Sequence, residues 1–119
     1  MTIHKRETAT SWDELPPTIT TYLTAHEARD AATAITAFTD DAVVTDEGHT
    51  YRGRDDINDW LLHAASGFTF TTEFVGATRD AEHIDVVQHL EGDFPGGVAD
   101  LHFRFTMAGA LVSRLVIEP

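Results

Sequence analysis

Apolar residues in the first half of the chain recur with the period of an α-helix. A stripe at positions i, i+3, i+4 and i+7 is formed by Ile19, Tyr22, Leu23 and His26. Prolines are tolerated in a first helical turn, so residues 11–17 are expected to contain the helix start. Asp30 is a suitable N-cap for a second helix, whose shared face consists of Ala31, Ala34, Ile35 and Phe38.

A short strand and a third helix are predicted next. Asp40 and Asp41 end the second helical pattern, and the β-branched run at 42–46 predicts a strand. Residues 47–53 are rich in turn-forming types and are expected to be a connection. The third helical stripe consists of Ile57, Trp60, Leu61 and Ala64. Gly67 stands where a helix C-terminus favours a left-handed residue.

The second half of the chain alternates between apolar and polar residues, which is the pattern of strands with one buried face. The alternation runs through residues 68–74, 84–90 and 101–107, and turn-forming residues separate these segments. Residues 111–117 are more uniformly apolar, so we expect a strand covered on both faces. Short connections favour a meander of neighbouring antiparallel strands.

These elements predict an α+β fold in which the helices and the sheet form separate layers. At 119 residues the chain is long enough for one domain with a proper core and too short for two. We assign residues 15–119 to this domain and residues 1–14 to a flexible N-terminal arm.

Composition narrows the function classes. The net charge of −12 argues against nucleic acid as a partner, because phosphate contacts need clustered lysine and arginine. The absence of cysteine excludes disulfides and thiolate metal sites. No apolar run has the roughly 20 residues that cross a membrane. Because the first residues also lack the apolar stretch of a signal peptide, we expect a cytoplasmic protein.

The order of these segments and their short sequence motifs resemble those of the nuclear-transport-factor-2-like (NTF2-like) superfamily, and within it those of the SnoaL-like group. The resemblance rests on residues 30–38, 40–46, 51–57, 109–111 and 115–117, and it spans residues 15–119. It implies a cone in which a curved, antiparallel or mixed sheet wraps around three helices and encloses an internal pocket. It also implies a homodimer formed through the outer sheet face.

Asp46 and Tyr22 are the candidate catalytic residues. Asp46 shares strand parity with Val44 and Ala42, so it points toward the cavity if Val44 faces the core. Burial there raises the pKa of a carboxyl and suits it to acid–base work. Tyr22 lies on the first helical stripe and would offer a hydroxyl donor to an oxyanion. The alternatives are a turn-capping aspartate and a core tyrosine.

The two residues together resemble the tyrosine and aspartate of ketosteroid isomerases in chain order. Those enzymes place a protonated carboxylic acid at a third position, which falls here at Leu101. Asp100 and His102 are adjacent but are expected to face the opposite side of the strand. The resemblance therefore implies an incomplete oxyanion site.

A pocket of this kind would be mostly apolar. We expect its lining to include Trp60, Gln88, Phe70, Phe74, Leu101, Phe103 and His49, although the aromatic residues could equally form the core. Gln88 interrupts an apolar face, so it needs a hydrogen-bond partner or an opening to the cavity. His26 is interpreted as a structural histidine, and polar sets such as His83, Asp85 and His89 are placed on the outer sheet face. No zinc-type spacing occurs, and no metal is expected.

Two functions are the main candidates, and a third interpretation, a structural or assembly module whose cavity is filled by Trp60 and the phenylalanines, is also open. One is an isomerase or cyclase that needs no cofactor and transfers a proton on a small apolar carbonyl compound. The alternative is a non-catalytic protein that binds a small hydrophobic ligand or a protein partner. Hydrolase activity ranks lower, because Asp46 is the only carboxylate placed for it, and lyase activity ranks lower as well.

Overall fold

The computed structural model of the chain describes residues 8–66 and 70–119. Its helical elements are η1 (Trp12–Glu14), α1 (Pro17–Glu27), α2 (Ala31–Ala34), η2 (Ile35–Ala37) and α3 (Gly53–Ser66). Its strands are β1 (Thr8–Thr10), β2 (Phe38–Asp46), β3 (His49–Arg52), β4 (Phe70–Arg79), β5 (His83–Gly92), β6 (Val98–Ala108) and β7 (Leu111–Glu118). No helix in these ranges is long and apolar enough to cross a membrane.

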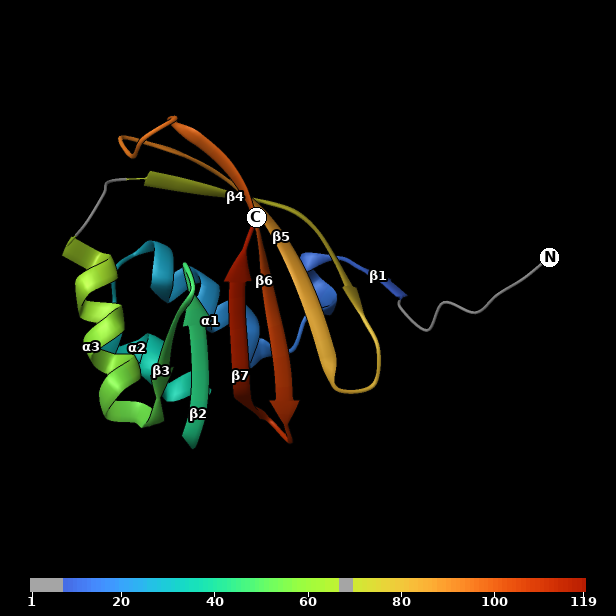
Figure 1. The fold of residues 1–119 in the computed structure, drawn as a ribbon. Coiled ribbons are helices and arrows are strands. Elements are labelled where there is room, and N and C mark those ends of the chain that lie inside the picture. The colour runs from blue at the N-terminus through green and yellow to red at the C-terminus, as the bar shows by residue number, and fades with distance from the viewer. Residues whose placement is uncertain (1–7, 67–69) are drawn as a thin grey trace.

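The strands form one mixed, curved sheet, and the three α-helices lie together on one side of it (Figure 1). The strand order is β1-β4-β5-β6-β7-β2-β3, in which β2 and β7 are parallel and the other neighbours are antiparallel. The predicted α+β fold and its meander are therefore confirmed. Packing the curved inner face against the helices produces a core of fully buried side chains such as Phe38, Ile57 and Phe105.

The first two helices follow their predicted stripes, but the second is shorter than expected. Ile19, Tyr22 and Leu23 of α1 are buried against the sheet. Asp30 caps α2, where its carboxylate accepts a hydrogen bond of 3.1 Å from the Thr33 N–H. The helix then tightens into the 3₁₀ turn η2, and Phe38 already belongs to β2. The strand predicted at 42–46 therefore begins four residues earlier, with a register irregularity between Phe38 and Val43.

The segment 47–53, predicted as a connection, contains an additional strand of the sheet. Residues His49–Arg52 form β3, which pairs antiparallel with the end of β2. Glu47 and Gly48 make the two-residue turn between them, with positive φ angles of 54° and 79°. Both central residues of such a hairpin turn need positive φ to match the strand twist.

The four long strands of the second half lie close to their predicted positions. The predicted start of the first of them, Phe68, and the predicted helix end at Gly67 lie outside the described residues. Strand β7 is buried on one face only: Val112 and Leu115 have no exposed surface, while Arg114 on the outer face is exposed. The apolar composition of β7 thus did not indicate cover on both sides.

Part of the predicted N-terminal arm is incorporated into the fold. Strand β1 pairs with β4, and Thr10 lies opposite Ala77. Trp12 of η1 then packs edge-on against Phe74, with ring centroids 5.5 Å apart. Residues 8–14 therefore extend the sheet and cover the inner face of β4.

Candidate functional site

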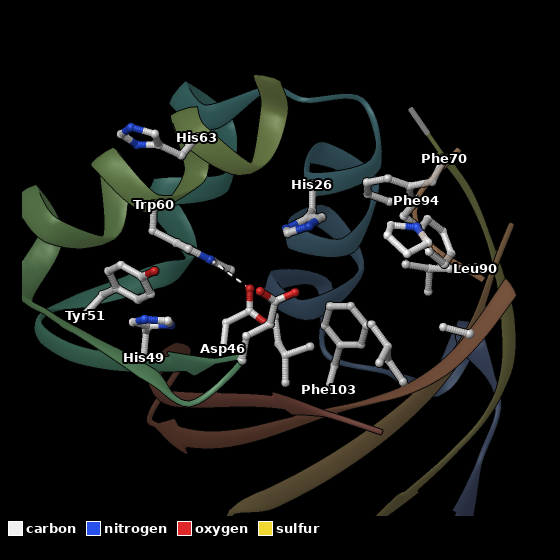
Figure 2. A pocket seen from close by; sticks show the side chains of 15 residues that line it. His26, Asp46, His49, Tyr51, Trp60, His63, Phe70, Leu90, Phe94 and Phe103 are labelled. Atoms are coloured by element: carbon white, nitrogen blue, oxygen red, sulfur yellow. Dashed lines mark hydrogen bonds between the residues drawn. The ribbon is translucent and has the colours of Figure 1, made fainter. Parts of the chain in front are cut away.

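One cavity of about 640 Å³ opens between the inner face of the sheet and helices α1 and α3 (Figure 2). Its polar lining residues come from the β2–β3 hairpin and the two helices, whereas its apolar wall comes from β4 to β7. The lining consists of His26, Asp46, Glu47, His49, Tyr51, Trp60, His63, Phe70, Leu90, Phe94, Pro95, Ala99, Leu101, Phe103 and Ile117. Its size is typical of a pocket for a small molecule.

The β2–β3 hairpin places Asp46 on the cavity wall. Asp46 is the last residue of β2 and lies on the inner face with Val44, as strand parity predicts. Its neighbours across the sheet are His49 on β3 and Ile117 on β7, and Ile117 lies opposite Phe103 on β6. The carboxylate therefore stands in a row of side chains that is apolar toward β6 and polar toward β3.

Helix α3 supplies the hydrogen-bond partner of Asp46. The Trp60 indole N–H donates to Asp46 Oδ2 over 3.1 Å, which leaves Oδ1 without a hydrogen bond among the described residues. Burial raises the pKa of Asp46, although the bond from Trp60 acts against this effect. The negative charge of Glu47 raises this pKa further, and His49 lowers it. The net result is an Asp46 carboxyl whose pKa lies above its usual value.

His26 is the second polar group of the cavity. It follows Tyr22 by one turn on α1, and Figure 2 shows its ring directed into the space that Asp46 also borders. The rings of Trp60, Phe70 and Phe103 surround it, with centroids 5.7, 6.4 and 6.1 Å away. This burial lowers the pKa of His26 to about 4, so the imidazole is neutral at physiological pH.

Tyr22 lies behind His26 and does not line the cavity. It has no exposed surface, and its hydroxyl lies 2.9 Å from His26 Nδ1. Burial, together with the charge of Asp46, raises the pKa of Tyr22 well above its usual value. The predicted direct contact between this hydroxyl and a substrate is therefore replaced by a contact through His26.

The other predicted pocket residues divide into two groups. The cavity wall includes Trp60, Phe70, Leu101, Phe103 and His49. Phe74 and Gln88 do not line it, although they share one cross-strand row with Leu101. The row leads away from the cavity, through Gln88 on β5, which is 5% exposed, to Phe74 on β4, which Trp12 covers. A register irregularity after Phe74 also changes the course of β4.

Several lining residues were not predicted. Tyr51 lies opposite Val44 on the inner face, and recognising the hairpin at Glu47–Gly48 would have identified it by parity. Leu90 follows the alternation of β5, which gave its face but not its position at the cavity. Phe94 and Pro95 belong to the turn between β5 and β6, where no periodicity indicates the direction of a side chain.

The outer sheet face carries the polar sets that were expected there. His89 Nδ1 lies 2.6 Å from Asp100, and His89 Nε2 lies 3.0 Å from Glu91. His102 is bonded to Asp85 at 2.9 Å. These pairs show that Asp100 and His102 face away from the cavity, while Leu101 between them lines it. Within residues 8–66 and 70–119, no cluster of histidine and carboxylate residues is arranged to hold a metal ion.

Comparison with known proteins establishes the family. The SnoaL-like domain matches residues 19–114, which is most of the chain. The chain belongs to the SnoaL-like domain family. No curated protein matches it.

Solved structures agree with this SnoaL-like assignment. One is a Sinorhizobium meliloti protein named as an inferred polyketide cyclase, with a TM-score of 0.84, 29% identity and coverage of 89% of this chain and 97% of that one. A Catenulispora acidiphila protein with a ketosteroid isomerase-like fold, in complex with trimethylamine, has a TM-score of 0.78, 17% identity and coverage of 87% and 85%. A Mycobacterium tuberculosis protein in complex with estradiol-17beta-hemisuccinate has a TM-score of 0.70, 13% identity and coverage of 86% and 90%. The last two likenesses show the NTF2-like fold.

Proposed function

We propose that this SnoaL-like protein is an isomerase or cyclase that transfers a proton on a small apolar carbonyl compound. Asp46 is the base, and His26 donates a hydrogen bond to the carbonyl oxygen. One observation carries the proposal: an ionisable carboxylate with a raised pKa and a neutral imidazole line the same cavity beside an apolar wall. Groups tuned in this way in a pocket are typical of acid–base catalysis.

The reaction begins with removal of a proton from the carbon next to the carbonyl. The Asp46 carboxylate accepts this proton, and the electrons of the broken C–H bond form an enolate whose negative charge lies on oxygen. An N–H donor at that oxygen stabilises the enolate more strongly than the ketone, which is the condition for accelerating the step. A neutral imidazole with its N–H toward the ligand meets this condition.

The second step distinguishes the two reactions. In an isomerisation, protonated Asp46 returns the proton to a different carbon of the enolate. In a cyclisation, the enolate carbon bonds to a second carbonyl carbon of the same molecule, and the resulting alkoxide takes the proton from Asp46. Both routes restore the carboxylate, so the protein is unchanged after each turnover.

The apolar side chains that line the cavity support an apolar substrate. Leu90, Leu101 and Phe103 form a wall from β5 and β6, and the rings of Phe70 and Phe94 line the same cavity (Figure 2). The likeness to a protein named as an inferred polyketide cyclase and to one solved in complex with a steroid ester supports a fused-ring or ring-forming carbonyl compound.

Exchange of deuterium from D₂O into a ketone tests the proposal. The probe is a bicyclic β,γ-unsaturated ketone, whose α-proton signal is followed by NMR and whose conversion to the conjugated ketone is followed by ultraviolet absorbance. We expect Asp46→Asn to slow exchange by at least about 100-fold, the usual contribution of a general base. Asp41→Asn is the matched control, because Asp41 lies on the same strand and is exposed.

The same probe separates the enzyme from the alternative binding protein. A Trp12→Phe variant leaves Trp60 as the only tryptophan, and Trp60 lines the cavity. Fluorescence quenching by the ketone without any deuterium exchange would refute the catalytic proposal in favour of a ligand-binding protein. Equal exchange rates in wild type and Asp46→Asn would remove Asp46 from the mechanism.

A further inference from the structure

The Tyr22–His26 pair is built so that its hydrogen bond has one favoured direction. The phenol ring is completely buried, and the rings of Phe38 and Phe105 meet it edge-on at 5.5 and 5.8 Å. Within residues 8–66 and 70–119, His26 Nδ1 is the only hydrogen-bond partner of the hydroxyl. The hydroxyl proton therefore has a single polar acceptor available to it.

Counting protons decides between the two possible arrangements. A neutral tyrosine and a neutral imidazole share two polar protons among three atoms: the phenol oxygen, Nδ1 and Nε2. If Nδ1 carried the imidazole proton, it would donate to the phenol oxygen, and the hydroxyl proton would face apolar rings. If Nε2 carries it, the hydroxyl donates to Nδ1, and the imidazole proton lies on the ring nitrogen that keeps contact with the cavity, where water or a ligand can accept it. Because an unmade hydrogen bond in a buried place is costly, the second arrangement is favoured.

We infer that Tyr22 is a positioning residue that holds His26 in the tautomer with the proton on Nε2. Since Tyr22 occupies Nδ1, Nε2 is the ring nitrogen left for a ligand in the cavity. The cavity then presents a hydrogen-bond donor at His26 and an acceptor at Asp46. The tautomer itself follows from the pair alone, whereas its use on a carbonyl oxygen rests on the proposed function.

This assignment defines the class of ligand that the site recognises. A group placed against His26 must accept a hydrogen bond, as a ketone, ester or enolate oxygen does. A group that can only donate, such as an ammonium, would leave the Nε2 proton of His26 unpaired and is disfavoured there. Tyr22 thereby determines the polarity of the site without contacting the ligand.

Long-range ¹H–¹⁵N NMR at pH 7 tests the tautomer directly, because protonated and unprotonated ring nitrogens have well-separated shifts. The His26 signals are assigned by their loss in His26→Gln. We expect at least about a tenfold excess of the tautomer protonated at Nε2, as a lost buried hydrogen bond implies. In Tyr22→Phe the excess should fall toward a mixture. Tyr51→Phe, at the other tyrosine of the chain, should leave the wild-type pattern unchanged.

The outcomes are distinct from those of the activity test. Protonation of Nδ1 in the wild-type protein would overturn the inference, and this measurement does not depend on whether Tyr22→Phe folds. An unchanged tautomer ratio in a folded Tyr22→Phe variant would also overturn it. If the Nε2 tautomer is found but no ketone exchange occurs, the proposed function fails and the positioning role of Tyr22 in the pair stands. In an active protein, we expect Tyr22→Phe to lower kcat about tenfold with KM nearly unchanged.

Discussion

Burial of His26 has a measurable consequence for acid stability. The folded protein holds the pKa of His26 at about 4, against 6.5 for the unperturbed side chain. Between these two values the unfolded chain binds a proton that the folded chain does not, so stability falls as the pH falls from 6.5 to 4. One pKa unit corresponds to about 1.4 kcal/mol, so the full depression corresponds to about 3 kcal/mol of unfolding free energy. This loss is large compared with the stability of a typical small domain.

The His26→Gln variant isolates this contribution. A glutamine carbonyl can still accept the Tyr22 hydroxyl, but it does not titrate. Urea unfolding of both proteins from pH 7 to pH 4 is the assay, since the carboxylates affect both equally. We expect the wild type to lose about 3 kcal/mol more than the variant over this range. His49→Gln, at an exposed histidine of the same cavity, is the control and should follow the wild type. Parallel stability curves for wild type and His26→Gln would refute the burial of a neutral imidazole.

Three further changes test the surroundings of the site. Trp60→Phe removes the hydrogen-bond donor that lowers the pKa of Asp46. The exchange rate falls at low pH as Asp46 becomes protonated, and in this variant that fall (the acid limb) should move to higher pH. Glu47→Gln removes a charge that raises the same pKa and should move the limb to lower pH; shifts in the same direction would contradict the assigned causes. Gln88 has no side-chain hydrogen bond among the described residues and keeps only a small area in contact with water, so Gln88→Met should raise the unfolding free energy by less than about 1 kcal/mol in urea titrations. A loss of stability would reveal a partner for the Gln88 amide.

Most of the fold could be predicted because its long elements have clear periods. The stripe at Ile19, Tyr22 and Leu23 and the alternation through Ile84 and Val86 specify which faces are buried. Short elements carry too few residues for a period. The four residues of β3 have the composition of a turn and were predicted as a connection. Because a 3₁₀ turn follows α2, Phe38 was assigned to the helix and the start of β2 was not recognised. The dimer expected through the outer sheet face stays a prediction.

The candidate site was predicted less completely, because periodicity gives the face of a side chain and not its depth. Tyr22 and His26 share one face of α1, but residues four apart lie one helical turn from each other. That step places Tyr22 inside the core and His26 on the cavity wall. Parity likewise put Gln88 and Leu101 on one face, and only the curvature of the sheet determines that Leu101 reaches the cavity.

Each of the two reactive groups of the cavity is fixed by one hydrogen bond from an aromatic side chain. Trp60 donates a hydrogen bond to Oδ2 of Asp46, and Tyr22 is hydrogen-bonded to Nδ1 of His26. Each group is thereby fixed in direction and keeps one atom for a ligand, Oδ1 of Asp46 and Nε2 of His26. Burial makes both groups costly to ionise: it raises the pKa of Asp46, the base, and it keeps His26 a neutral hydrogen-bond donor by lowering its pKa to about 4. Replacing His26 by glutamine should therefore improve acid stability and slow exchange at once, because both effects come from the burial of one imidazole.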